Sequence, residues 1–444
     1  MSTLKVASFI ADTDFEEFPP AVVAQAKVAI RDTLGVALAA HGDRAVEATR
    51  GVALAMGGTG ESTLIGIGAK APCNIAAWVN AVMASTLDMD DGAWGTTGHK
   101  GHTGGIVVPS ALAVAEAHHA TGREFITAVV VGYEVALRTG WMIAKTIDHP
   151  LAAGTPGTYG ATATVATLRG LRTEEIVNAL GIAEAHCPWY HGEGFHPVNM
   201  TKEVAGWGAM TGVSAVLLAR EGFGGRRAIY DHPTYDRTPL ETLGKEWEIL
   251  DLYFKPYSAC RFCHPSLDGV LQLAKEYHLK TGDISKITVG VPSVRLAENF
   301  AKYRPPTIWE AQYSIPFTIG AALVDGEVGP EQVAEQRLAD GTILGLANTV
   351  TLVADPDVEA LLPEALGGKV RIETKDGSEY ETFVTTPKGD PANPLTEEEL
   401  SGKFRKLAGL VLGAERTEEL FHCLQRLEEL ESLDELVKII GRCR

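Results

Sequence analysis

The segment STLDMDDGAWGTTGHKGHTGGIVVP holds a dense group of ionisable side chains. Three carboxylates, at Asp88, Asp90 and Asp91, precede a glycine-rich stretch that carries two imidazoles, at His99 and His102. Imidazoles and carboxylates are the groups that proteins use to move protons near neutral pH. We therefore interpret this segment as part of a functional site. The alternative is a solvated loop with capping residues, because such loops also collect Asp and Gly.

The elements that must position this segment are the apolar runs on either side of it. Residues 75–89 are apolar enough for a buried helix, which places the carboxylates near its C-terminus, where the helix dipole disfavours negative charge. Cations must therefore lie near by, and His99, Lys100 and His102 are available. Residues 106–119 predict a second helix, whose N-terminal N–H groups could hold an anion.

The residue pattern of the first half of the chain is typical of a helical bundle. Ala- and Gly-rich segments joined by short polar links let helices approach closely. We predict helices at residues 21–40, 75–89, 106–119, 125–146, 159–169, 173–185 and 207–221.

The texture changes at about residue 283. Segments rich in β-branched residues predict strands at 284–291, 350–353, 370–374 and 380–384, and Lys375-Asp376-Gly377-Ser378 indicates a hairpin between the last two. Helices are expected near 265–277 and 315–325, and residues 397–441 are again amphipathic helix.

This order predicts a mainly α protein with an α+β part. We expect a large all-helical domain over residues 1–256, a smaller α/β lid domain over 257–395, and C-terminal helices over 396–444 that return to the helical domain. A cleft between the two domains is the expected place for a small ligand.

Composition excludes several classes of function. The chain has 444 residues, 45% of them hydrophobic, and a net charge of −18, which argues against binding nucleic acid. No apolar run approaches the ~18 residues of a membrane span, and the acidic N-terminal region does not resemble a signal peptide. We therefore expect a globular cytoplasmic protein with no membrane contact.

No metal or cofactor is expected. A metal could bind at Cys260-Arg-Phe-Cys263-His264, but a zinc site needs a second pair of ligands, and the sequence has none at the required spacing. The glycines of Ile65-Gly66-Ile67-Gly68 lack the third glycine of a dinucleotide fingerprint. Six scattered cysteines in a chain of this length do not indicate a disulfide framework.

Several short motifs, taken in order along nearly the whole chain, resemble the MmgE/PrpD family, which includes 2-methylcitrate dehydratase, cis-aconitate decarboxylase and iminodisuccinate epimerase. The motifs are Ala26-Lys27, Asp32-Thr33-Leu34-Gly35, Leu87-Asp88-Met89-Asp90-Asp91, Gly157-Thr158-Tyr159-Gly160-Ala161, Thr201-Lys202, Lys255-Pro256-Tyr257 with Arg261 and His264-Pro265, and Pro387-Lys388-Gly389-Asp390-Pro391 before Asn393-Pro394-Leu395-Thr396. The resemblance implies the helical domain plus lid described above, usually as a homodimer.

The resemblance also implies cofactor-free chemistry on a small di- or tricarboxylate, starting with removal of a proton from a carbon beside a carboxylate. Such a proton is weakly acidic, so a positioned base and cationic carboxylate binders are needed. Dehydration, as in 2-methylcitrate dehydratase, is our first expectation. Epimerisation and decarboxylation are the alternatives among enzymes, and a non-catalytic carboxylate-binding protein is the alternative outside them.

Five residues carry the catalytic roles that the resemblance implies. Lys202 is the base or a carboxylate clamp, His102 the proton donor or acceptor facing it, and Asp88 the residue that orients an imidazole or keeps the lysine charged. His149 is the nearest candidate for a second catalytic histidine, and Tyr159 is an alternative second base for epimerisation.

Substrate-binding roles fall on both sides of the expected cleft. Arg261 and His264, with Lys255 and Tyr257 beside them, could complete a carboxylate clamp, the alternative being an interdomain ion pair. His99 and Asp91 are expected to line the site from the other side.

The chain departs from the family pattern at three positions that matter for substrate choice. Gly92 stands where many members have Thr, Ala205 where a His is expected, and Phe317 where a Tyr is expected. Loss of such polar groups removes hydrogen bonds to a substrate, so we expect the substrate to differ from 2-methylcitrate or cis-aconitate.

Overall fold

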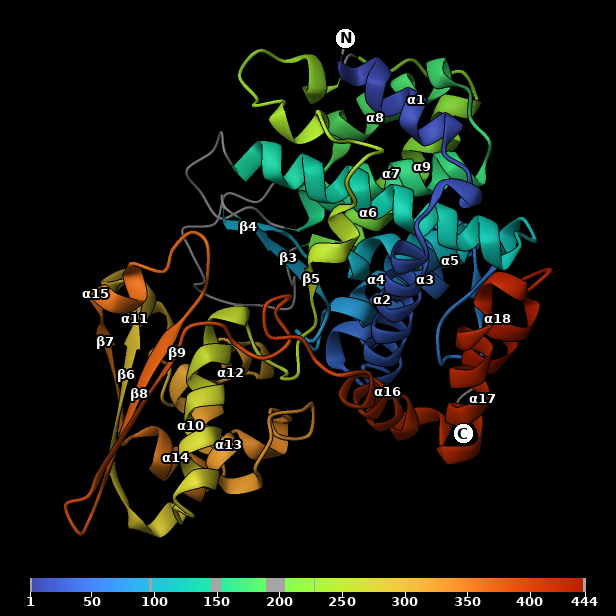
Figure 1. Ribbon diagram of the computed structural model, residues 1–444. Coiled ribbons are helices and arrows are strands. Elements are labelled where there is room, and N and C mark those ends of the chain that lie inside the picture. Colours follow the sequence, from blue (N-terminus) through green and yellow to red (C-terminus); the bar gives the residue numbers. More distant parts are fainter. Residues whose placement is uncertain (1, 96–97, 145–152, 189–203, 227, 442–444) are drawn as a thin grey trace.

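A computed structural model of the protein describes residues 2–95, 98–144, 153–188, 204–226 and 228–441. Helices predominate, and they gather in one large body from which a smaller body with a sheet projects (Figure 1). Buried apolar side chains form two separate cores, one within each body. The fold class predicted from the sequence, mainly α with an α+β part, is confirmed.

The larger body is built from the N-terminal helices and short strands. They are α1 (Ser2–Asp12), α2 (Pro20–Ala39), α3 (Arg44–Met56), β1 (Ser62–Thr63), β2 (Lys70–Ala71), α4 (Cys73–Ser85), β3 (Gly92–Gly95), β4 (Gly98–Gly101), α5 (Gly104–Ala117), α6 (Gly122–Ala144), α7 (Gly154–Leu168), α8 (Thr173–His186), α9 (Ala205–Arg220) and β5 (Leu252–Tyr253). The seven predicted helices are confirmed, although α4 ends at Ser85 and not at residue 89.

Small residues allow these helices to pack closely, as expected. A Cβ atom at Gly212 of α9 would lie 2.5 Å from the Cβ atom of Ala161 in α7. On another side of α7, a Cβ atom at Gly160 would lie 2.7 Å from that of Ala136 in α6. Helix α7 therefore contacts α6 and α9 almost backbone to backbone.

Helix α6 is the one described helix long and apolar enough to cross a membrane by length and composition alone. Its most apolar window is 94% buried within the protein, so it is a core helix of the bundle. No apolar run of this length was expected from the sequence, because that expectation did not allow for the few charged residues within 122–144.

The smaller body contains a four-stranded sheet and the helices packed on it. Its elements are α10 (His264–Glu276), β6 (Ile284–Val291), α11 (Val294–Phe300), α12 (Ile308–Gln312), α13 (Ile315–Asp325), α14 (Gly341–Ala347), β7 (Val350–Ala354), α15 (Pro356–Glu359), β8 (Gly368–Thr374) and β9 (Glu379–Val384). The strand order is β7-β6-β8-β9; β6 and β7 are parallel and the other pairs antiparallel. All four predicted strands and the hairpin at 375–378 are confirmed.

Buried and more exposed residues alternate along β8, which shows which face of this sheet is covered. Gly368, Val370, Ile372 and Thr374 are buried, and the residues between them are more exposed. Val370 packs beneath Gly269 of α10, which lies across the same face. We call this smaller body the lid.

The last helices lie against the larger body (Figure 1). They are α16 (Glu397–Leu412), α17 (Ala414–Gln425) and α18 (Asp434–Ile440). Gly35 of α2 leaves room for Phe404 of α16, whose ring would lie 3.1 Å from a Cβ atom at that position. Lys403 of α16 also pairs with Asp32 of α2 at 2.7 Å, so two residues of the Asp32–Gly35 motif hold α16 in place.

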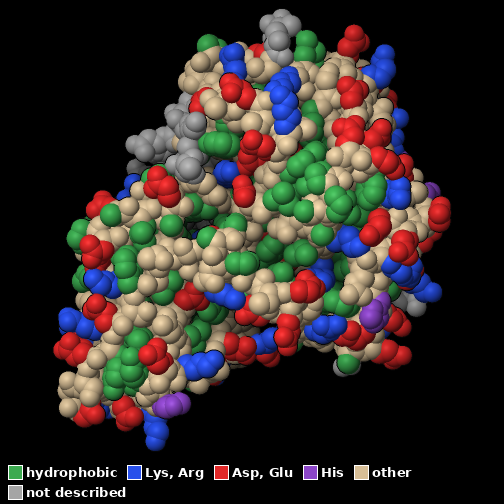
Figure 2. All heavy atoms as spheres, viewed as in Figure 1, with side chains coloured by type: hydrophobic (Ala, Val, Ile, Leu, Met, Phe, Trp, Pro, Cys, Tyr) green, Lys and Arg blue, Asp and Glu red, His purple; other side chains and the backbone are tan. Residues whose placement is uncertain are grey.

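Acidic and basic side chains are interspersed on one face of the molecule (Figure 2). Figure 2 shows acidic and basic side chains side by side over both bodies on the face that it draws. The three carboxylates singled out in the sequence are buried, each at most 1% exposed.

Candidate active site at the junction of the helical body and the lid

The carboxylate segment follows α4 in an irregular conformation. Asp88 adopts a left-handed backbone conformation, with a φ of 50°, which Asp tolerates better than most residues. The lid holds this segment through its backbone: the Ser258 hydroxyl donates to the carbonyl of Leu87 at 2.6 Å, and the Gln312 amide donates to that of Thr86 at 3.3 Å. The segment is thus fixed from both bodies.

A lysine and a histidine lie beside the buried carboxylates. The Lys255 ammonium, fully buried, forms an ion pair with Oδ1 of Asp88 and lies 3.8 Å from Oδ1 of Asp90. The other oxygen of Asp90 lies 3.6 Å from Nδ1 of His102. Lys255 therefore balances buried charge, and the carboxylate beside the His102 imidazole is that of Asp90. The carboxylate clamp expected for Lys255 stays a prediction.

Asp91 occupies the N-terminus of α5. Its Oδ1 accepts from the Gly104 N–H at 2.9 Å and its Oδ2 accepts from the Tyr133 hydroxyl at 2.5 Å. Burial raises the pKa of Asp91 to about 7. The group at this helix end is thus the protein's own carboxyl group, and the substrate contact predicted for Asp91 stays a prediction.

The two histidines lie on and after a short hairpin. Strands β3 and β4 pair antiparallel with a bulge at Ala93 and Trp94, and β3 also pairs with β5. The imidazole rings of His99 and His102 are 4.7 Å apart. Sequence reasoning expected an irregular glycine-rich loop here; the glycines instead allow close packing, since a Cβ atom at Gly95 would lie 2.5 Å from the Lys100 side chain.

Hydrogen bonding fixes the proton on His102. Its Nδ1 lies 2.8 Å from the carbonyl oxygen of Asp91, which can only accept, so Nδ1 carries the hydrogen. Nε2 is then the nitrogen through which His102 can gain or lose a proton. This is the arrangement expected of a general acid–base residue.

Arg261 extends from the lid to Tyr253, whose ring also contacts His102. Its guanidinium stacks on the ring of Tyr253 at 4.4 Å, and its Nη2 donates to Asp390 at 2.7 Å. Nε and Nη1 are buried and have no hydrogen-bond partner among the described residues. Asp390 is held there because its neighbour Gly389 accepts a hydrogen bond from the Phe254 N–H at 2.9 Å, an approach that any Cβ atom at 389 would block.

His264, at the start of α10, is a buried neutral imidazole. Its Nε2 donates to the carbonyl of Ala259 at 3.0 Å, so its Nδ1 is an acceptor, and Nδ1 has no partner among the described residues. Burial, with the positive charges of Arg261 and Lys255, holds the pKa of His264 well below its usual range. Beside it, Tyr257 donates to Asp268 at 2.7 Å, so this hydroxyl is used within the lid.

Three further residues were predicted to be catalytic. Lys202 and His149 lie outside the described residues. Tyr159 of α7 packs edge-on against Tyr230 at 5.8 Å, and burial, with Cys187 and Glu184 as nearby groups, raises its pKa. The catalytic role of Tyr159 stays a prediction.

The Cys260–His264 segment shows no metal-site geometry. Cys263 is buried with its thiol 3.8 Å from the Gln312 carbonyl, and Nε2 of His264 bonds to backbone. Within the described ranges, no group of three or more His, Cys, Asp or Glu side chains is arranged to hold a metal ion. The five cysteines within those ranges are free thiols.

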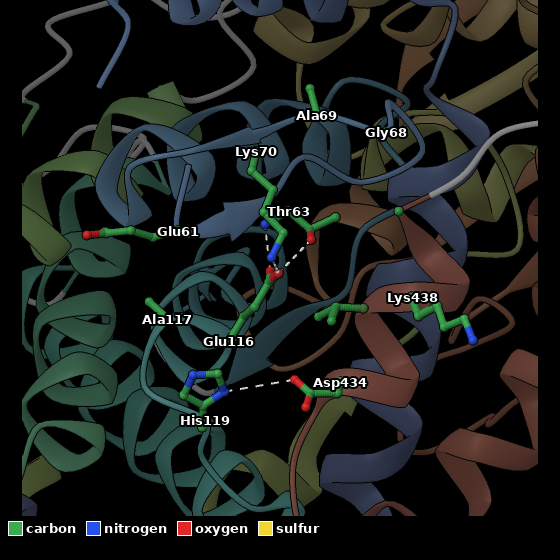
Figure 3. A pocket seen from close by; sticks show the side chains of 12 residues that line it. Glu61, Thr63, Gly68, Ala69, Lys70, Glu116, Ala117, His119, Asp434 and Lys438 are labelled. Carbon is green, nitrogen blue, oxygen red and sulfur yellow. Dashed lines mark hydrogen bonds and ion pairs between the residues drawn. The ribbon is translucent and has the colours of Figure 1, made fainter. Parts of the chain in front are cut away.

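A separate pocket of about 530 Å³ lies among β1, β2, the end of α5 and α18 (Figure 3). Four of its ionisable side chains form two pairs: Lys70 with Glu116 at 2.8 Å and His119 with Asp434 at 4.0 Å. Glu116 also accepts from Thr63. None of the predicted site residues lines this pocket, so we place the candidate site at the junction and not here.

Comparison with known proteins identifies the family. The MmgE/PrpD N-terminal domain matches residues 4–235, and the MmgE/PrpD C-terminal domain matches residues 257–426. The chain belongs to the MmgE/PrpD family. The MmgE/PrpD resemblance seen in the sequence motifs is confirmed.

Similar MmgE/PrpD proteins carry related names. The chain is 26% identical to a cis-aconitate decarboxylase-like protein oryM of Aspergillus oryzae, over 86% of this chain and 85% of that protein. It is 27% identical to the cis-aconitate decarboxylase of Mus musculus, over 84% and 79% of the two chains. With that of Aspergillus terreus, identity is 24% over 99% and 96%.

Two residues of the junction were not among the predicted site residues of this MmgE/PrpD chain. Asp90 belongs to the motif, but only the structure shows that it lies between Lys255 and His102. Tyr253 contacts both Arg261 and His102, and its only sequence signal was the unexpected Gly92, which faces it across β3 and β5.

Proposed function

We propose that the protein is a cofactor-independent lyase that removes a proton from a carbon next to a carboxylate of a small di- or tricarboxylate. One observation carries the proposal: a proton-transfer group and a carboxylate binder from different bodies meet at one aromatic ring. His102 approaches the Tyr253 ring edge-on at 6.2 Å, and Arg261 stacks on the same ring at 4.4 Å. The names of the relatives, which act on cis-aconitate or resemble proteins that do, support this class of substrate.

In this proposal Arg261 binds a substrate carboxylate through its Nε and Nη1 hydrogens. Charge that develops on that carboxylate as the neighbouring proton leaves is stabilised by the guanidinium. Nε2 of His102 exchanges the proton, while Nδ1 is kept protonated by the Asp91 carbonyl and Asp90 stabilises the charged ring. Lys202 keeps the role of a base or second clamp that the family resemblance implies.

Dehydration is the reaction that we propose first. Nδ1 of His264 is a buried hydrogen-bond acceptor, and burial, with the positive charges of Arg261 and Lys255, keeps its ring neutral. An acceptor of this kind suits a substrate hydroxyl, which a dehydratase substrate carries beside the acidic carbon. Hydroxy di- and tricarboxylates similar to 2-methylcitrate are therefore the first substrates to test, with 2-methylcitrate itself included for comparison.

Decarboxylation is the second candidate, because the relatives named above are cis-aconitate decarboxylases or similar to them. Epimerisation is the third, and it needs a second base on the opposite face, which Lys202 would supply. A carboxylate-binding protein without activity is the remaining alternative.

Product analysis separates these candidates. The protein is incubated in deuterated water with a panel that includes citrate, 2-methylcitrate, cis-aconitate and imino- and hydroxydicarboxylates, and products are followed by proton NMR. Dehydration gives a new alkene signal, decarboxylation gives a product one carbon shorter, and epimerisation gives deuterium at carbon without either. Citrate bound with none of these changes would contradict the lyase proposal.

A matched pair of variants tests the residue assignment. His102→Gln removes the proton-transfer nitrogen and is expected to lower turnover by about 100-fold or more. His422→Gln makes the same change on an exposed face of α17 and is expected to leave turnover unchanged. Equal activity of the two variants would remove His102 from the mechanism.

We also propose that the protein works in the cytoplasm as a homodimer. Free thiols at the described cysteines are consistent with a reducing compartment. Light scattering on the purified protein measures the oligomeric state, and a mass near the 47.3 kDa of one chain would contradict the dimer.

A further inference from the structure

Tyr253 lies where the helical body passes into the lid. It is 0% exposed and ends β5, which pairs with β3 at Gly92 and leads directly into Phe254 and Lys255. Figure 1 shows β5 beside β3, between the helical body and the lid. A fully buried tyrosine at this place contacts groups from both bodies.

Gly92 provides the space for the Tyr253 hydroxyl. A Cβ atom at position 92 would lie 2.6 Å from Cζ of Tyr253 and closer still to its oxygen. The same atom would lie 3.1 Å from the Gly101 carbonyl oxygen, so it could not move aside on that flank. Any side chain at 92 must therefore displace the phenol.

The ring and the hydroxyl of Tyr253 contact different partners. The ring face carries the Arg261 guanidinium at 4.4 Å, and its edge meets His102 at 6.2 Å. The hydroxyl lies 3.5 Å from Nε2 of His99, whose ring is 4.7 Å from that of His102. One side chain thus touches the carboxylate binder and both imidazoles.

We propose that Tyr253 is a positioning residue for the reaction, with two separable parts. Its ring fixes the Arg261 guanidinium for substrate binding, and its hydroxyl, admitted by Gly92, holds the His99–His102 pair for proton transfer. This inference rests on the proposed function, because it gives Arg261 and His102 the roles described above.

The two parts predict different kinetic effects on whichever substrate the panel identifies. Tyr253→Phe keeps the ring and removes the hydroxyl, so KM is expected to stay within about twofold while kcat falls about tenfold, the worth of one hydrogen bond. Tyr253→Leu removes the ring as well, so KM is expected to rise by about 5- to 30-fold, the range of a buried cation–π contact.

Two further variants complete the design. Gly92→Ala displaces the phenol without changing it and is expected to lower kcat at least as much as Tyr253→Phe. Tyr230→Phe is the matched control: Tyr230 is also buried, its hydroxyl bonds to Thr139 at 2.7 Å, and it has no described contact with Arg261 or His102. Tyr230→Phe is expected to keep the parent kcat and KM.

Three results would overturn the inference. They are parent kinetics in Tyr253→Phe and Tyr253→Leu, equal losses in Tyr253→Phe and Tyr230→Phe, or a rise in KM as large in Tyr253→Phe as in Tyr253→Leu. Thermal unfolding of every variant identifies any loss that comes from a failure to fold. If another variant fails to fold, the kinetics of Tyr253→Phe, the mildest change, decide whether the inference holds.

Citrate binding separates this inference from the proposed function. If the parent protein turns over none of the panel, the proposed function fails, and calorimetry with citrate still tests the ring. Tyr253→Leu is then expected to bind citrate at least fivefold more weakly than the parent and Tyr253→Phe within about twofold. Equal affinity of all three would overturn the role of the ring.

Discussion

Replacing Lys255 by Met tests how the carboxylate segment is held between the two bodies. Lys255 is fully buried, pairs with Asp88 and lies 3.8 Å from Asp90. The substitution keeps an unbranched apolar stem and removes the ammonium group with its charge and its hydrogen bond to Asp88. Both aspartates are at most 1% exposed, so water cannot replace the ammonium without opening the junction.

The expected loss is large. At an effective dielectric constant of about 20, two unit charges 3.8 Å apart attract by about 4 kcal/mol. Removal of one partner of a buried ion pair typically costs about 3–5 kcal/mol, because the remaining charge is buried without compensation. We therefore expect Lys255→Met to lower the free energy of unfolding by about 3–5 kcal/mol.

Urea unfolding followed by circular dichroism measures this loss, with two comparison variants. Lys286→Met removes a half-exposed lysine, 3.3 Å from Glu373 on the lid sheet, and is expected to cost less than about 1 kcal/mol. The double variant Asp88→Asn/Lys255→Met neutralises the Asp88 carboxylate, with a residue that tolerates positive φ, and is expected to regain part of the loss. A loss in Lys255→Met no greater than in Lys286→Met would refute the reasoning.

Three smaller predictions concern the supports of the site. Burial raises the pKa of Asp91 to about 7, so its protonated form adds stability below about pH 4 that is lost as the pH rises towards 7. The stability of Asp91→Asn relative to the parent, measured by urea unfolding, should therefore increase from about pH 4 to about pH 7. A difference that stays constant over this range would contradict the prediction. Gly104→Ala places a Cβ atom 2.6 Å from the Asp91 carboxylate and is expected to cost about 1–3 kcal/mol by the same assay, whereas Gly345→Ala, in open space, should cost nothing. Thr396→Ala removes the N-cap of α16 and is expected to lower the unfolding free energy by about 1 kcal/mol; no loss would show that the cap is dispensable.

The elements of the fold were predictable because their signals are local. Helices and strands follow from the spacing of apolar residues, and the turn at Asp376 and Gly377 follows from residue types that favour it: Asp376 accepts from the Ser378 N–H, and Gly377 has a φ of 88°. The end of α4 was misplaced by a few residues, because the apolar pattern continues past Ser85 while the lid holds the next residues out of the helix.

The hairpin of β3 and β4 was not predictable in the same way. Its strands are rich in glycine, which has little β propensity, and β3 also pairs with β5 about 160 residues further along the chain. The backbone pairing there depends on tertiary packing around Tyr253 and Lys100, which no local pattern encodes.

Residue types indicated the candidate site, but they did not indicate which of its side chains pair with each other. His102, Arg261 and His264 meet the requirements for acid–base chemistry and carboxylate binding wherever they lie in the sequence. Lys255 pairs with Asp88, although the two residues are far apart in the chain. Asp91, one of three neighbouring aspartates that could do so, accepts the hydrogen bond from the N-terminus of α5. Such choices are made by the folded geometry.

A crystal structure with a bound tricarboxylate tests the central claim most directly. We predict density for a citrate carboxylate on Nε or Nη1 of Arg261, with the neighbouring carbon within reach of Nε2 of His102. Citrate bound only in the pocket of Figure 3, beside Lys70 and Lys438, or only on the outer surface, would contradict the account.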